Sequence, residues 1–201
     1  MGKLITVIGP SGVGKTALVR ALTRAGNFET ALEQHEERPF QALFKLDARY
    51  GLANQIDYFL LRAEQERTLR ARLRIGLIDG GLDLDYHGFA RLFHARGLLT
   101  DSEFDLCRRL YETLRDLMPL PELIVRLRAN QETVADRLSA RDRINIASAE
   151  DFAIFESFLD KWLKLLDPVC ILEVDVTQND PGYTRLIPSL LPEIVSRLGW
   201  F

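Results

Sequence analysis

Short apolar runs alternate along the chain with longer segments in which apolar and charged residues recur at helical spacing. Most of the runs lack the polar alternation of a half-exposed strand, which is typical of strands buried on both faces of a parallel sheet. We expect strands at residues 4–8, 28–32, 75–79, 123–127 and 170–176. We expect helices at residues 17–22, 54–74, 85–95, 101–117, 149–166 and 184–198, and one that ends at 137–143. This alternation predicts an α/β fold, with a five-stranded parallel sheet between two layers of helices.

A glycine-rich stretch joins the first predicted strand to the first predicted helix. It fits the phosphate-binding pattern of glycine, any four residues, glycine, lysine, and serine or threonine: Gly9-Pro10-Ser11-Gly12-Val13-Gly14-Lys15-Thr16. The glycines let backbone N–H groups turn toward a phosphate chain, Lys15 adds a positive charge, and Thr16 offers a hydroxyl to Mg²⁺. We therefore expect an ATP and Mg²⁺ site that uses Gly9, Ser11, Gly12, Val13, Gly14, Lys15 and Thr16.

Carboxylates follow two of the predicted strands, at the sheet edge where open α/β folds bind their ligands. Asp79 ends the strand at 75–79, and we expect it to hold Mg²⁺ together with Thr16. Glu33, Glu36 and Glu37 follow the strand at 28–32. One of these three glutamates is a candidate general base.

Length and charge narrow the class of protein. The chain has 201 residues and 47% hydrophobic content, which favours one domain over 1–201. Lys and Arg number 26 against 29 Asp and Glu, and this balance gives no reason to expect a nucleic-acid or membrane partner. Cys107 and Cys170 lack metal-ligand or redox spacing, and no leader or membrane-length apolar run is evident. We expect a cytoplasmic protein that acts on a small molecule.

Further residues keep spacings that resemble those of the deoxynucleoside kinase family, from Lys3 to about Trp162. They are Glu33 five residues before Arg38-Pro39, the set Arg49-Tyr50, Gln55 and Arg62, the set Asp79, Asp85 and Phe89, and the set Arg137, Arg141 and Arg143. The resemblance implies a three-layer phosphate-loop kinase fold. It also implies transfer of the γ-phosphoryl group of ATP to the 5′-hydroxyl of a deoxyribonucleoside.

The resemblance assigns a role to each of these positions. Glu33 would be the catalytic base, with Glu37 in reserve, and Gln55, Arg62, Asp85 and Phe89 would bind the nucleoside. Residues 137–149 would form an arginine-rich lid. In this lid Arg137 would bind the nucleotide, while Arg141 and Arg143, with Lys15, would stabilise the transferred phosphoryl group.

The chain departs from the family pattern at three places. Gly80 stands where an arginine is expected directly after the strand-end acid. The residues that read the sugar 3′-hydroxyl are replaced by the Phe44-Lys45 segment and by Ile146. We therefore expect sugars altered at C3′ to be tolerated, because an apolar contact rejects little.

Two other functions fit the same motifs. A nucleoside monophosphate kinase similar to thymidylate kinase would need cations for its acceptor, and Arg38, Lys45 and Arg49 are candidates. A nucleotide-binding protein without transferase activity would also keep the phosphate loop. We further expect a homodimer, because the kinases that this chain resembles pair through long helices such as 54–74 and 101–117.

Overall fold

The computed structural model describes residues 2–31, 38–139, 149–178, 180 and 182–199. The five predicted strands are present as β1 (Leu4–Ile8), β2 (Phe28–Ala31), β3 (Ile75–Asp79), β4 (Leu123–Arg128) and β5 (Ile171–Asp175). They form one parallel sheet in the order β2-β3-β1-β4-β5, with Ile5 opposite Leu77 and Val7 opposite Val125. The prediction of a five-stranded parallel sheet is confirmed. β1 is the central strand, so the glycine-rich loop leaves the middle of the sheet.

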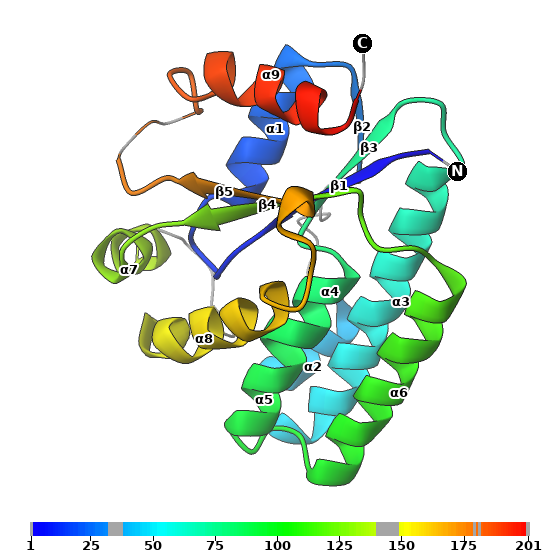
Figure 1. Cartoon of the computed structure of the whole chain (residues 1–201). Helices are drawn as coiled ribbons and strands as arrows, with labels where there is room; N and C mark the ends of the chain where they lie inside the picture. Colours follow the sequence, from blue (N-terminus) through cyan, green and yellow to red (C-terminus); the bar gives the residue numbers. More distant parts are fainter. Residues whose placement is uncertain (1, 32–37, 140–148, 179, 181, 200–201) are drawn as a thin grey trace.

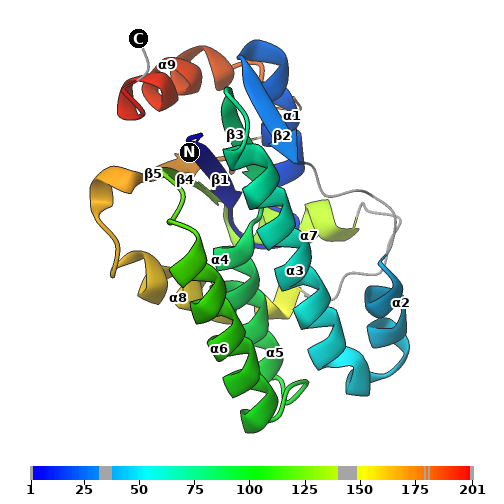
Figure 2. The same cartoon turned by 90° about the vertical axis from the view of Figure 1, so that its right-hand side faces the viewer.

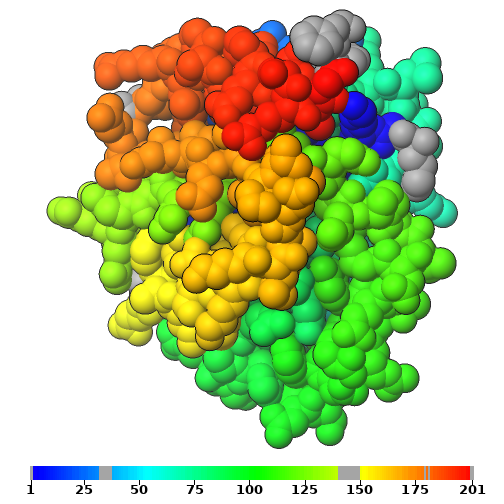
Figure 3. Space-filling view, in the orientation of Figure 1, coloured from blue at the N-terminus to red at the C-terminus, as the bar shows by residue number. Residues whose placement is uncertain are grey.

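Helices cover both faces of this sheet (Figure 1). One face carries α1 (Lys15–Ala25), α7 (Gln131–Ser139) and α9 (Ile187–Arg197). The other carries α3 (Gly51–Arg70), α4 (Leu82–Leu84), the π-helix η2 (Asp85–Ala90), α5 (Arg91–Ala95), α6 (Asp101–Leu117) and α8 (Phe152–Leu163). Short 3₁₀ turns lie at Ala48–Tyr50 (η1), Ala149–Asp151 (η3) and Pro168–Cys170 (η4). On the face drawn in Figure 3, the C-terminal segments, yellow to red, form one continuous area beside the green surface of the middle of the chain.

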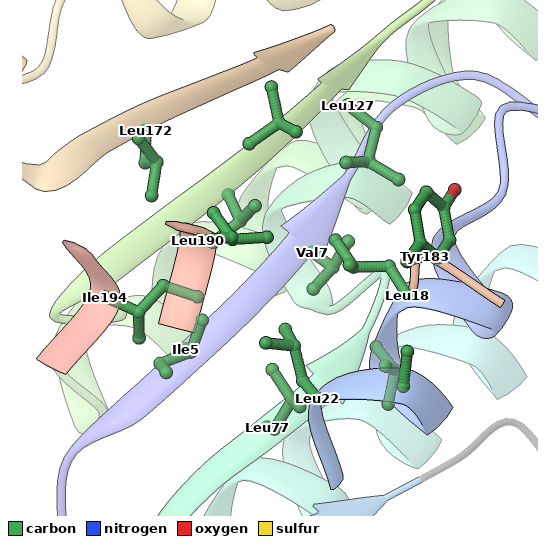
Figure 4. Packing of buried hydrophobic residues seen from close by; sticks show 14 of the residues in the cluster. Ile5, Val7, Leu18, Leu22, Leu77, Leu127, Leu172, Tyr183, Leu190 and Ile194 are labelled. Atoms are coloured by element: carbon green, nitrogen blue, oxygen red, sulfur yellow. The ribbon is translucent and has the colours of Figure 1, made fainter. Parts of the chain in front are cut away.

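Each face of the sheet has its own apolar core, because strand side chains point alternately to the two sides. Ile5, Val7 and Leu77 pack against Leu18 and Leu22 of α1 in the first core (Figure 4). The second core lies under α3, α6 and α8; it includes Ile8, Phe59, Leu92, Cys107, Ile124, Phe155 and Leu159. Apolar packing on both faces of one sheet makes the three-layer arrangement that the sequence predicts.

The structure corrects several predicted boundaries. The helix predicted at 54–74 is α3 and covers Gly51–Arg70, and the helix predicted at 184–198 is α9. Helical structure predicted from Asp85 begins at Leu82 and passes through a π-turn, and the helix predicted at 149–166 is η3 followed by α8. The helix α2 (Pro39–Leu46) was not predicted; it lies beside α3 (Figure 2).

The predicted start of α6 is confirmed by its hydrogen bonds. Thr100 is the cap residue: its hydroxyl accepts from the Glu103 N–H at 3.3 Å, and the Glu103 carboxylate accepts from the Thr100 N–H at 2.8 Å. This reciprocal pair is a capping box. Among the helices of the described residues, none has the length and apolar character needed to cross a bilayer.

Candidate active site

The phosphate loop connects β1 to α1, and its three glycines have positive φ angles: 142° at Gly9, 85° at Gly12 and 113° at Gly14. The Lys15 ammonium donates to the carbonyl oxygens of Gly9 and Pro10, at 3.0 Å each. The charge is therefore held across the mouth of the loop, at the N-terminus of α1, where the helix dipole also favours an anion. The loop has the strand, turn and helix context that phosphate binding requires.

Thr16 and Asp79 meet beside this loop. The Thr16 hydroxyl donates to Asp79 Oδ2, and the Asp79 carboxylate lies at the end of β3, opposite Val7 of β1 in the sheet register. A hydroxyl and a carboxylate together are oxygen donors of the type that Mg²⁺ takes, the remaining ligands being phosphate oxygens and water. No group of three or more His, Cys, Asp or Glu able to hold a metal occurs in the part of the chain described. The donor set here fits an ion that arrives with the phosphates.

Arg137 contacts the phosphate loop from outside. Its Nη1 donates to the carbonyl oxygen of Val13 and its Nη2 to that of Val176, both at 2.8 Å. Arg137 lies on α7, which therefore connects the phosphate loop to the segment after β5. Arg141 and Arg143, the other arginines of the predicted lid, lie outside the described residues.

The four residues predicted to bind the nucleoside come from α3 and η2. Arg62 Nε donates to Asp85 Oδ2 at 3.1 Å, and the two side chains are only 4% and 5% exposed. Gln55, seven residues before Arg62 on the same face of α3, donates from Nε2 to the backbone oxygen of Asp85 at 2.9 Å. Phe89 packs edge-on against Phe155, with ring centroids 5.1 Å apart. The structure thus brings Gln55, Arg62 and Asp85 into direct contact and places Phe89 four residues further along the chain.

The backbone turn after β3 is shaped around Arg62. Gly80 has a φ of 89°, and a Cβ placed there would lie 3.3 Å from Arg62 Nη2 and 3.7 Å from Cζ. The guanidinium group therefore lies directly beside the position where the family pattern has an arginine. A positive charge is present at this end of β3 although Gly80 itself carries none.

A second polar cluster, which the sequence did not predict, lies behind Asp85. Arg115 of α6 makes two hydrogen bonds to the carboxylate of Glu66, at 2.9 and 2.6 Å, and one of 3.0 Å to Asp83. The Tyr111 hydroxyl donates to Asp83 at 2.8 Å and lies 3.1 Å from His87 Nε2. These contacts join α4, through Asp83, and η2, through His87, to α3 and α6.

Burial changes the titration of this cluster. Desolvation raises the pKa of Glu66 despite the neighbouring Arg115. The His87 ring stacks on Trp162 with ring centroids 4.7 Å apart. Burial, followed by the charges of Arg91 and Arg115, lowers the pKa of His87 to about 3. His87 is therefore neutral at physiological pH.

The cations considered for a monophosphate acceptor are placed as follows. Arg38 makes a bidentate ion pair with Asp57 of α3, through Nε and Nη2. Arg49 is exposed and pairs with Asp47 at 3.0 Å, while Lys45 lies in the last turn of α2. Phe44, beside Lys45, is buried against Phe93 with ring centroids 5.1 Å apart. Arg38 and Arg49 are thus already neutralised by carboxylates of this chain.

Several predicted residues lie outside the part of the chain that the structure describes. They are Glu33, Glu36, Glu37, Arg141, Arg143 and Ile146. Their predicted roles stay predictions.

Comparison with known proteins adds to this geometry. The family model described as deoxynucleoside kinase matches residues 5–184. A deoxyadenosine kinase of Dictyostelium discoideum is 29% identical over 143 residues, 71% of this chain and 58% of that protein. A deoxyadenosine/deoxycytidine kinase of Bacillus subtilis is 25% identical over 143 residues, 70% of this chain and 66% of that protein. The match thus spans less than two thirds of the length of either relative.

A deoxyguanosine kinase of Bacillus subtilis is 28% identical over 185 residues, 88% of this chain and 87% of that protein. Among solved structures, a deoxyadenosine kinase from M. mycoides with bound dCTP superposes with a TM-score of 0.77 at 17% identity. The superposition covers 94% of this chain and 99% of that one, and it confirms the phosphate-loop kinase fold.

Proposed function

The chain belongs to the deoxynucleoside kinase family, and we propose that it transfers the γ-phosphoryl group of ATP to the 5′-hydroxyl of a nucleoside. The observation that carries the proposal is the arrangement of two polar sets on the described residues. Lys15 and Thr16 lie at the end of the phosphate loop, and Asp79 accepts a hydrogen bond from Thr16. The Arg62–Asp85 pair lies beside Gly80, the residue that follows Asp79. A triphosphate site and a site for a polar base edge are therefore neighbours.

In the proposed reaction the 5′-oxygen of the nucleoside forms a bond to the γ-phosphorus of ATP. The bond between that phosphorus and the oxygen bridging the β- and γ-phosphates breaks, and ADP leaves with the bridging oxygen. The proton of the 5′-hydroxyl passes to a carboxylate, for which Glu33 is our candidate from the sequence. Phosphoryl transfer requires little covalent chemistry from the protein, so positioning and charge dominate the rate.

The donor end of this site is the phosphate loop. We assign Lys15 to the outer phosphates, where its charge opposes the negative charge of the transferred group. Thr16 and Asp79 would hold Mg²⁺, which when bound neutralises part of the charge on the phosphate oxygens. Arg141 and Arg143 are our candidates for closing the lid over the same phosphates.

The acceptor end is the set on α3 and η2. Gln55, Arg62 and Asp85 together offer donors and acceptors, which is what the edge of a base requires, and Phe89 offers an apolar ring edge. Because Arg38 is paired with Asp57, a phosphate on the acceptor would have to displace a carboxylate to reach it. This pairing favours a nucleoside over a monophosphate as the acceptor. A cytoplasmic location and a single domain over 1–201 stay predictions.

The experiment that tests this function measures ADP release with a panel of acceptors. We expect release with at least one nucleoside, little with nucleoside monophosphates, and little with ATP alone. A 2′,3′-dideoxynucleoside should lose no more than about tenfold against its parent, which is the scale of one modest contact. Release with monophosphates would instead identify a monophosphate kinase, and ATP binding without release would identify a binding protein.

Two variants control this experiment. Lys15→Ala should abolish turnover with little change in melting temperature, because it removes a phosphate contact and no core packing. Lys164→Ala removes an exposed lysine at the end of α8 and should leave turnover unchanged. Full activity of Lys15→Ala would contradict the assignment of the donor site.

A further inference from the structure

Tyr183 has an unusual backbone conformation for its residue type. Its φ is 59°, in the left-handed region, and it is the single non-glycine residue with positive φ among those that the structure describes. Residues with a Cβ avoid this region unless the surrounding structure holds them in it, and such residues cluster at functional sites. We therefore expect contacts near Tyr183 that hold its backbone in the left-handed region and offset the cost of this conformation.

Asp180 supplies the local cause. Its backbone oxygen accepts from the Tyr183 N–H at 2.9 Å, and its carboxylate accepts from the N–H groups of Arg185 and Leu186 at 3.0 and 3.3 Å. The Thr184 hydroxyl donates to the same carboxylate at 3.1 Å. The turn is thus held on both sides of Tyr183, and the side chain is directed toward the sheet.

The Tyr183 side chain reaches the phosphate loop. Its ring is buried beside Leu18 and Val7 of the first core, with the hydroxyl at the end away from Leu22 (Figure 4). The hydroxyl donates to the carbonyl oxygen of Gly14 at 3.2 Å. A Cβ on Gly14 would lie 2.2 Å from that hydroxyl oxygen, so the contact also requires glycine at this position.

The carbonyls on the outer side of the loop are fixed one after another. The Gly14 oxygen accepts from the Leu18 N–H at 3.0 Å as well as from Tyr183, so both of its lone pairs are used. The preceding carbonyl, that of Val13, accepts from Arg137 at 2.8 Å. In a trans peptide the C=O and the following N–H point in opposite directions. Holding these two oxygens outside the loop therefore directs the N–H groups of Gly14 and Lys15 to its inner side.

We propose that Tyr183 is a positioning residue of the phosphate loop, which through the Gly14 carbonyl orients the Lys15 N–H toward the donor phosphates. Arg137 does the same for the Gly14 N–H through the Val13 carbonyl. This inference rests on the proposed function, because it takes the molecule bound in the loop to be the phosphate chain of ATP. It adds a residue from the β5–α9 connection, about 170 positions away in sequence, to the donor site.

A residue that only filled the core would not need the hydroxyl. Phenylalanine has the same ring and would occupy the same space beside Leu18, but it lacks the group that reaches Gly14. Tyr183→Phe therefore separates the contact with the loop from the packing of the ring. The matched control is Tyr111→Phe, which removes another buried hydroxyl, bonded to Asp83 on the opposite face of the sheet.

Two measurements on the full-length variants test the inference. In the ligand-free protein, hydrogen exchange of the amides of residues 9–18 should be at least about threefold faster in Tyr183→Phe, because one hydrogen bond to the loop is lost. In titration calorimetry with Mg-ATP, the Kd of Tyr183→Phe for ATP should be about fivefold higher than that of the wild type. The KM of the variant for the nucleoside should stay within about twofold of the wild-type value. Tyr111→Phe should change neither loop exchange nor the Kd for ATP.

The outcomes distinguish this inference from the proposed function. Unchanged exchange of the loop in Tyr183→Phe overturns the inference, whether or not the protein binds ATP. Faster exchange with an unchanged Kd for ATP also overturns it, because the loop order would then have no effect on the donor. If the wild type binds no ATP, the proposed function fails, and the exchange measurement alone decides whether Tyr183 orders the loop.

Discussion

Removing the buried Arg62–Asp85 pair should separate the stability of this protein from its activity. The two side chains are 4% and 5% exposed and lie 3.1 Å apart, so neither charge is well solvated. Arg62→Met leaves the Asp85 carboxylate buried without this guanidinium, which costs about 3–5 kcal/mol in the free energy of unfolding. For a chain of this size the melting temperature falls about 2–4 °C per kcal/mol, so we expect a loss of roughly 6–20 °C.

The double variant Arg62→Met/Asp85→Leu should recover most of that loss. Two apolar side chains of similar volume replace the ion pair, and such replacements are often neutral or stabilising because no charge remains buried. Activity should not recover with stability. The double variant lacks both side chains that would hydrogen-bond to the edge of the base, so the nucleoside should bind poorly. We expect kcat/KM for the best nucleoside to fall on the order of 100-fold or more.

The assay pairs thermal unfolding with ADP release, each measured on the single variants, the double variant and the wild type. Arg126→Met is the matched control, because Arg126 is also a buried arginine, 3% exposed and 2.8 Å from Glu156. It should lose stability and keep its turnover per folded molecule. A double variant that regains the wild-type melting temperature and also keeps wild-type kcat/KM would refute the assignment of Arg62 and Asp85 to the nucleoside.

Two further predictions concern assembly and pH. We expect a homodimer through α3 and α6, where the side chains of Leu60 and Leu106 remain 49% and 43% exposed. The double variant Leu60→Glu/Leu106→Glu should sediment with the mass of a monomer. A wild-type protein that is monomeric at micromolar concentration would contradict this prediction. His87, whose pKa burial lowers to about 3, stays neutral in the folded protein while the unfolded chain takes up a proton below about pH 6.5. Its contribution to the free energy of unfolding is therefore complete above pH 6.5 and decreases by up to about 1.4 kcal/mol per unit as the pH falls. Between pH 6.5 and 5 the melting temperature of His87→Gln should fall less steeply than that of the wild type.

Local sequence patterns were sufficient to predict the sheet and the phosphate loop. The apolar runs and the glycine spacing are each determined by residues close together in the chain, so periodicity and turn chemistry identify them. The missed helix α2 also had a local signal. Pro39 stands in its first turn, and Phe40, Leu43 and Phe44 follow at helical spacing.

The polar cluster behind Asp85 could not be predicted in the same way. Glu66, Asp83 and Arg115 belong to three elements and are far apart in sequence, so no spacing rule connects them. The family resemblance did assign Arg62 and Asp85 to one nucleoside site, and the structure shows their side chains in contact. By contrast, nothing in the local sequence distinguishes Glu66 and Asp83 from surface carboxylates. Their contacts with Arg115 arise only because α6 packs against α3.

Gly80 and Arg62 depend on each other. A side chain at residue 80 would have to adopt a φ of 89° and would begin 3.3 Å from the Arg62 guanidinium, so it would strain the backbone and shift that guanidinium by a few tenths of an ångström. Glycine at residue 80 lets the Arg62 guanidinium lie beside the end of β3 without that shift. Because Asp85 holds that guanidinium in place, we infer that one charge serves both the acceptor set and the strand end near the phosphate loop. A change at Asp85 would then affect phosphoryl transfer as well as recognition of the base, since it would release the nearest described cation from Gly80.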